Sequence, residues 1–159
     1  MEQTQNYLQV LSESLDRKIV ILDELSRITE SQKNIAMAEN FDDEEYNRTV
    51  NEKDSLINEL ERLDKGFQTL YDNIKSQLDT GREKYRDEIK TLQVKIKQVL
   101  DKSAALQVAE ENNRRLVTNK LSSMRKEMRQ VRKTRNLAAN YYKSMNNISE
   151  NPVFLDQKK

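Results

Sequence analysis

The sequence lacks cysteine, histidine and tryptophan, and it has only two glycines and one proline among 159 residues. Without cysteine or histidine the chain forms no disulfide and no Cys- or His-based catalytic dyad or triad, and it lacks the usual ligands of zinc, haem and iron–sulfur clusters. So little glycine and proline argues against a turn-rich β fold. We therefore expect an all-α protein with few interruptions and no metal or other cofactor.

Long apolar runs are also missing. No run approaches the roughly 18 residues of a membrane span, and the start MEQTQNYLQV has neither the basic residues nor the apolar core of a signal peptide. Gly66 and Gly81 are too few for a glycine-rich phosphate loop, and the many carboxylates have the spacing of solvated helix faces. These absences predict a cytoplasmic protein that is not an enzyme and has no membrane span.

Apolar residues recur at spacings of three and four, which predicts three amphipathic helices, at about 4–39, 43–79 and 82–146, and a flexible tail at 147–159. At the first corner, Asp42 and Glu45 are typical of a capping box, and Phe41 and Tyr46 of a hydrophobic staple. We expect Gly81 to end the second helix in a left-handed conformation. The first predicted stripe is Leu8, Leu11, Leu15, Ile19, Leu22, Leu25 and Ile28. The second is Tyr46, Val50, Lys53, Ile57, Leu60, Leu63, Phe67, Leu70, Ile74 and Leu78.

The predicted lengths decide the architecture. The first two helices would be about 55 Å long and the third about 97 Å. Short connections make neighbouring helices antiparallel. We therefore expect a single domain over residues 1–159, an antiparallel three-helix bundle or coiled coil in which the third helix overhangs by about 40 Å, at about 120–146. A stutter in the spacing at 117–124 leaves open a fold-back that would make a four-helix bundle instead.

Two features inside the predicted helices have competing interpretations. Ser103, Glu110 and Asn113 interrupt the stripe of the third helix, either as a polar layer that fixes the register or as a face partly in water, and we favour the second interpretation. Gly66 lies within the second helix, and we favour close helix packing over a hinge as its explanation.

Charge is distributed unevenly. Residues 39–64 contain ten acidic and three basic residues, whereas residues 112–145 contain ten basic residues and one acidic residue, Glu127. The basic run is compatible with nucleic acid, with an anionic membrane surface, or with acidic groups of this fold or of a protein partner. In the expected bundle the acidic start of the second helix neutralises residues near 115–120. Because the cations surround a continuous apolar stripe, we favour a protein partner.

The sequence resembles the FlgN-type flagellar export chaperones. Three stretches carry the resemblance: EKDSLINEL at 52–60 running into LDKGF at 63–67, LQVAEEN at 106–112, and YYKSM at 141–145. The FliT-type sibling chaperones have a similar size and helical build. The resemblance implies a cytoplasmic chaperone that binds the terminal helical segments of hook–filament junction (hook-associated) proteins, prevents their premature assembly and delivers them to the export gate.

The resemblance places substrate binding in the C-terminal helical part, where an apolar stripe is also expected to lack a partner. The implied mechanism is helix-in-groove recognition, with arginines that steer acidic partners. The predicted partner-binding residues are Leu121, Met124, Met128, Arg129, Val131, Arg132, Arg135, Ala138, Tyr141, Tyr142 and Met145. A chaperone of this kind would be a monomer or a weak homodimer. The alternatives are a self-associating structural coiled coil and, less favoured, a basic-helix nucleic-acid binder.

Overall fold

The computed structural model describes residues 2–150, with side chains from residue 3 to residue 146, and all three of its elements are helices. Helix α1 spans Glu2–Met37, α2 spans Asp43–Thr80 and α3 spans Arg86–Glu150. The all-α prediction is therefore confirmed. The chain divides into two compact units that meet between Val117 and Thr118, and α3 contributes to both. That residues 1–159 form one domain stays a prediction.

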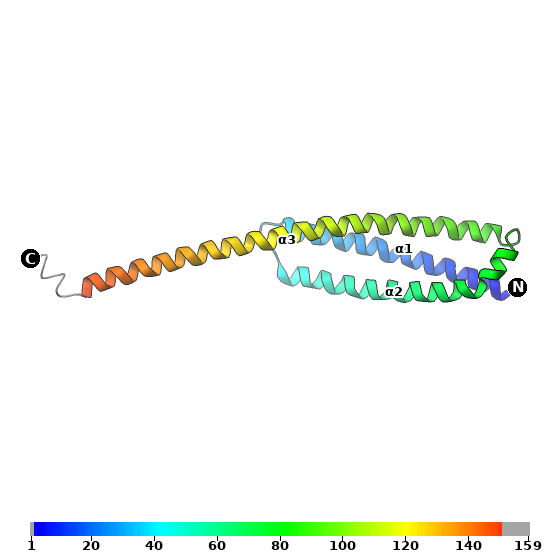
Figure 1. Ribbon diagram of the computed structural model, residues 1–159, viewed down its shortest axis with the longest axis horizontal. Coiled ribbons are helices and arrows are strands. Elements are labelled where there is room, and N and C mark those ends of the chain that lie inside the picture. The colour runs from blue at the N-terminus through cyan, green and yellow to red at the C-terminus, as the bar shows by residue number, and fades with distance from the viewer. Residues whose placement is uncertain (1, 151–159) are drawn as a thin grey trace, which may run out of the picture. The chain divides into compact units, whose positions relative to one another are not determined.

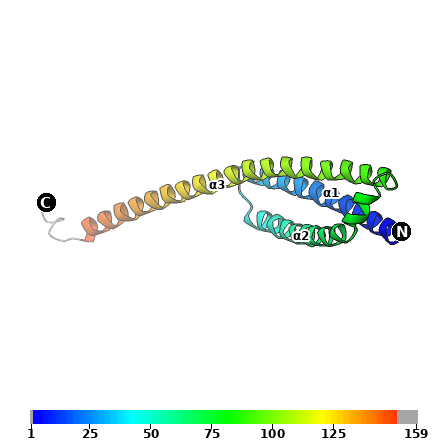
Figure 2. The ribbon, with the colours of Figure 1, turned by 45° about the vertical axis from the view of Figure 1, so that its right-hand side comes forward.

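The first unit is an antiparallel three-helix bundle (Figures 1 and 2). Arg17 of α1 pairs with Glu59 of α2 at 2.7 Å, and this contact fixes the level at which the two antiparallel helices face each other. Lys95 and Lys102 of α3 pair with Asp16 and Asp23 of α1, so α1 and α3 run in the same direction. The predicted antiparallel arrangement of neighbouring helices is therefore present in this unit.

The corner between α1 and α2 has the predicted chemistry. The Asp42 carboxylate accepts a hydrogen bond from the backbone N–H of Glu45 at 3.1 Å and so caps α2. The rings of Phe41 and Tyr46 lie 5.3 Å apart, as a hydrophobic staple requires. Because α1 ends at Met37, the corner is two residues longer than predicted.

The turn between α2 and α3 corrects the prediction for Gly81. Its φ is −107°, so it does not adopt the left-handed conformation. Glycine is needed here for space, because a Cβ would lie 2.9 Å from the Gln77 carbonyl oxygen and 3.1 Å from the Tyr85 ring. Burial of the Tyr85 side chain at this end of the core causes the close approach. Residues 81–85 form the turn, and α3 begins at Arg86 rather than at residue 82.

The core positions recur along each helix at alternating spacings of three and four residues, and together they form a seam between the helices. At the end of the bundle near the α2–α3 turn this seam is apolar. The seam corrects two predicted positions: in α1, Ile21 is fully buried and Ile19 only half-buried, and in α2, Ile57 is 40% exposed while Leu56 is half-buried. The members of this apolar cluster are Leu8, Leu11, Leu15, Ile74, Leu78, Tyr85 and Leu92.

Near the other end of the bundle the seam is polar. The Gln32 side chain joins all three helices, since its Nε2 donates to Thr49 Oγ1 at 3.0 Å and its Oε1 accepts from Lys53 Nζ at 3.0 Å and from Asn113 Nδ2 at 3.3 Å. Asn113 Nδ2 also donates to the Thr29 carbonyl at 3.0 Å. Asn113 is only 5% exposed, so the favoured interpretation of a water-facing helix side was wrong for this residue.

Glu110 belongs to the same polar layer. It forms an ion pair with Lys53 and accepts a hydrogen bond from the Thr29 hydroxyl at 3.0 Å. Burial, together with the charge of Glu110, raises the pKa of the Tyr46 phenol. Within the described residues, no buried side-chain nitrogen or oxygen lacks a hydrogen-bond partner. Ser103, the third residue that interrupts the stripe of α3, is half-buried outside the network.

Gly66 has a different environment from the predicted one. It is exposed, and a Cβ at this position would meet nothing within 4 Å. Close helix packing therefore does not explain this glycine, and the expected interpretation was wrong.

The second unit begins at Thr118, and its described part is entirely helical. Helix α3 has no break at 117–124, so the structure does not contain the fold-back that the stutter left open. The predicted end at residue 146 was wrong, because the helix continues to Glu150. The rest of the predicted tail, 151–159, lies outside the described residues. No helix in the described part of the chain is long and apolar enough to cross a membrane.

Candidate functional site

The candidate site is the exposed apolar stripe of α3 in the second unit. An α-helix turns by about 100° per residue, so residues spaced by alternating threes and fours share one face. Met128 is 58% exposed, Val131 56%, Tyr142 67% and Met145 48%. Every described side chain from Arg125 to Asn146 is exposed. The stripe is Leu121, Met124, Met128, Val131, Arg135, Ala138, Tyr142 and Met145.

Part of the predicted set lines one shallow groove of about 430 Å³ on the face of α3, and all of its residues belong to this one helix. Two methionines and a valine supply its apolar surface, and two arginines lie beside them. Methionine suits such a surface because its flexible thioether adapts to the shape of a partner. Glu127 lines the groove as well and was not predicted. The complete lining is Met124, Glu127, Met128, Val131, Arg132 and Arg135.

Other predicted residues lie outside this groove. Leu121, Ala138, Tyr142 and Met145 continue the stripe along α3, whereas Arg129 and Tyr141 do not belong to it. Each of the latter two is adjacent in sequence to a stripe residue, and one residue turns the helix by about 100°.

Leu137 was missed by the sequence reasoning. It is 69% exposed and lies four residues before Tyr141, so the two share a second, smaller apolar face. The signal that could have found this face is the four-residue spacing of two large apolar side chains outside the main stripe.

The cations that surround the stripe have no ion-pair partners among the described residues. From Arg125 to Lys143 there are seven of them, and Glu127 is the only acidic residue in that range. Such a surface attracts acidic groups and steers their approach. Arg114 and Arg115 differ from these, since both pair with Glu111 of their own helix. The prediction that the acidic start of α2 neutralises residues near 115–120 was therefore wrong for Arg115, whose ion-pair partner lies one turn away in its own helix.

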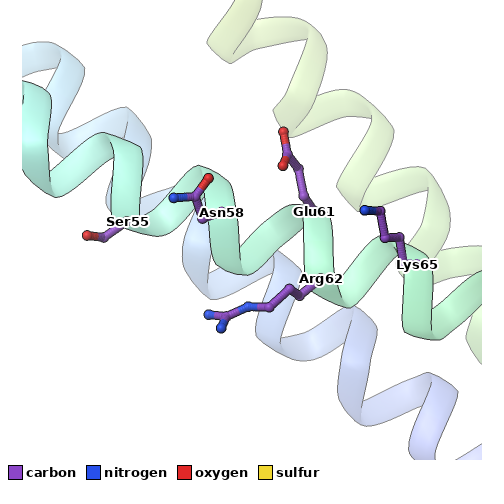
Figure 3. A pocket seen from close by; sticks show the side chains of 5 residues that line it. All are labelled: Ser55, Asn58, Glu61, Arg62 and Lys65. Carbon is purple, nitrogen blue, oxygen red and sulfur yellow. The ribbon is translucent and has the colours of Figure 1, made fainter.

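Polar clusters of the first unit do not form a second candidate. A depression of about 420 Å³ on α2 is lined only by polar and charged side chains (Figure 3), so it offers no apolar surface to a partner helix. The Arg17 guanidinium hydrogen-bonds to Glu59 and lowers the pKa of that carboxyl, but the pair is exposed and joins α1 to α2. Within residues 2–150 no cluster of carboxylates could hold a metal ion. The lining of the α2 depression is Ser55, Asn58, Glu61, Arg62 and Lys65.

Comparison with known proteins identifies a family. The model of a protein family described as "FlgN protein" matches residues 1–148 of the chain. No curated protein and no solved structure matches it. The match includes the bundle of the first unit and the described stripe of the second.

Proposed function

We propose a function for this chain from one premise, that it belongs to the FlgN protein family. The family consists of flagellar export chaperones, which bind flagellar proteins and are not enzymes. The chain would act in the cytoplasm, where it binds the terminal helical segments of hook–filament junction proteins. It would keep these subunits from assembling too early and deliver them to the export apparatus.

The observation that carries the proposal is the exposed stripe of the second unit. Large apolar side chains that follow one helix face and stay exposed are typical of a surface that another helix covers. Apolar residues at the same alternating spacing of three and four residues form the seam between paired helices. A terminal helical segment of a secreted subunit is a partner of this kind, because its own apolar face stays uncovered until the subunit assembles.

The two kinds of side chain on this surface would have different roles. Met128, Val131 and Tyr142 would bury apolar area against the partner, and this burial supplies the affinity. Arg132 and Arg135 would attract acidic residues that flank the partner's apolar face. Affinity would therefore depend on the apolar residues at any ionic strength, whereas the association rate would fall as salt is added.

The test uses the full chain and a peptide that contains the terminal helical segment of a hook–filament junction protein. Changing Met128→Asp together with Val131→Asp places two charges on the apolar face. We expect binding, measured by isothermal titration calorimetry, to weaken by at least about 100-fold, since each buried side chain of this size contributes about 1.5–3 kcal/mol.

The matched control is Gln130→Asp with Asn140→Asp, neither of which lies three or four residues from a stripe residue. It introduces the same charge into the same helix, away from the stripe, and removes no large apolar side chain. We expect this variant to bind within a few-fold of the unchanged chain. Binding that survives the first pair of changes, or that is lost equally in both variants, would contradict the assignment of this surface.

The same stripe would also suit self-association into a structural coiled coil. Light scattering coupled to size exclusion, over a series of protein concentrations, separates the two functions. A monomer, or a dimer that dissociates on dilution, agrees with a chaperone whose surface is open to substrate. A tight oligomer that persists at every concentration would contradict the proposed function.

A further inference from the structure

The C-terminal half of α2 and the start of α3 lie near the turn that joins them (Figures 1 and 2). Side chains of these two segments line a groove in the first unit. Its volume is about 840 Å³, about twice that of the groove in the second unit. Along each helix it extends for about 15–18 Å, or three helical turns, as judged from the residues that line it. It belongs wholly to the first unit and shares no residue with the candidate site above.

The groove has an apolar interior that α1 does not close. Leu78 and Leu92 line it as buried members of the core, while Tyr71 and Ile96 line it with 38% and 37% of their surface exposed. The Tyr71 ring stacks on Phe67 with centroids 6.4 Å apart, so the two rings form one continuous apolar surface.

Basic residues lie along one side of this groove. Arg82, Arg86 and Lys90 all line it at spacings of four residues, and Asp79 is the only acidic residue in the lining. None of the three cations has an ion-pair partner among the described residues.

The acidic residues of the same stretch of α3 lie elsewhere. Asp87 and Glu88 line a separate groove of about 470 Å³, whose other wall is α1. The start of α3 thus directs its cations toward the groove with α2 and two of its acids toward α1. A groove with exposed aromatic and aliphatic side chains along one uncompensated row of cations is complementary to a helix that has an apolar face and acidic flanks.

From this complementarity we propose that the α2–α3 groove is a second docking surface, which binds an acidic amphipathic helix of a protein partner. The helix would place apolar residues against Tyr71 and Ile96, and its carboxylates would pair with Arg82, Arg86 and Lys90. Three turns of helix fill the groove, so the recognised segment is short. The proposal does not depend on the proposed function, because the two surfaces belong to different units.

The probe is a synthetic, fluorescently labelled helical peptide of about three to four turns, with leucine every third or fourth residue and glutamate beside the leucine face. Binding to the full chain is followed by fluorescence anisotropy. We expect saturable binding that weakens as salt is added. A peptide of the same composition in shuffled order, and one with lysine in place of glutamate, should each bind at least tenfold more weakly.

Variants of the chain locate the binding. Arg86→Glu with Lys90→Glu, and separately Tyr71→Ala with Ile96→Ala, should each weaken it at least tenfold. The matched control is Arg62→Glu with Lys65→Glu, which makes the same charge change on the single-helix depression of α2 in Figure 3. Arg132→Glu with Arg135→Glu removes two cations of the candidate site in the second unit, which would attract the same probe, and so measures any part of the binding that belongs to that surface. The Arg62 and Lys65 control should not alter binding by more than about twofold, and circular dichroism of all four variants should match that of the unchanged chain.

Several results would overturn the proposal. Equal binding of the shuffled peptide would show charge attraction without a docking site. Loss of binding in the Arg132 and Arg135 variant, with retention in the groove variants, would place the site in the second unit. If the chain alone forms a dimer that the groove variants dissociate, the occupant is a second copy of this chain and not an acidic helix of another protein.

Discussion

In α3, residues 86–117 and residues 118–146 repeat the same three-and-four spacing of apolar positions, with opposite results for burial. Leu92 and Val117, at stripe positions of the first stretch, are 7% and 8% exposed, whereas Met128 and Val131 in the second are more than half exposed. Helices α1 and α2 supply the covering side chains in the first unit. The comparison teaches that spacing determines which face of a helix is apolar, while the presence of a neighbouring helix determines whether that face is buried.

The largest expected effect on the free energy of unfolding comes from a leucine-to-alanine substitution, compared between the two stretches of α3. Leu92→Ala removes a core side chain and should lower the free energy of unfolding by about 2–5 kcal/mol. Leu137→Ala, in the same helix but 69% exposed, should change it by less than about 0.5 kcal/mol. Urea unfolding followed by far-UV circular dichroism measures both. Equal losses for the two variants would show that the second stretch is packed as tightly as the first.

A smaller effect is expected from the polar layer. Asn113→Ala leaves the Thr29 carbonyl and the Gln32 side chain short of a donor, so it should cost about 1–3 kcal/mol. Asn136→Ala makes the same change at an exposed position of the second unit, where alanine's higher helix propensity should give no loss. Thermal unfolding of the two variants checks this difference. The polar layer would have no role in stability if Asn113→Ala unfolded at the same temperature as Asn136→Ala.

The smallest expected effect comes from replacing the two glycines of the first unit by alanine. The two positions compare the effect of helix propensity with the effect of packing. Gly66→Ala should raise the free energy of unfolding by about 1 kcal/mol, because the position is helical and open to solvent. Gly81→Ala should lower it, since the new Cβ would meet the Gln77 carbonyl oxygen. Chemical unfolding of both variants gives the two signs, and a loss of stability in Gly66→Ala would contradict the open environment described for this residue.

The number, order and approximate ends of the helices could be predicted from the sequence, because long stripes of apolar residues and the corner at Asp42 are local signals. Part of the core could not. Thr29, Gln32 and Thr49 are buried in the polar layer, and their burial depends on hydrogen-bond partners from other helices that no local pattern contains. For the same reason Asn113 was interpreted as facing water.

The candidate surface was predictable in outline. Met128, Val131 and Arg132 were expected on it and line one groove. Glu127 was missed because a lone acidic residue in a basic run gives no apolar signal, and Leu137 because it lies outside the main stripe. The groove between α2 and α3 could not be predicted, since it depends on how side chains from two separate helices meet beside the turn at 81–85.

The central claim is that the stripe of the second unit is covered by a flagellar subunit and not by this chain. Hydrogen–deuterium exchange of the full chain, alone and with a terminal helical segment of a hook–filament junction protein, tests it most directly. We predict that backbone amides at 121–145 exchange faster than those at 86–117 in the chain alone, and that adding the segment slows exchange at 121–145. Protection of 121–145 in the chain alone, or no change there while the segment is bound, would contradict the claim.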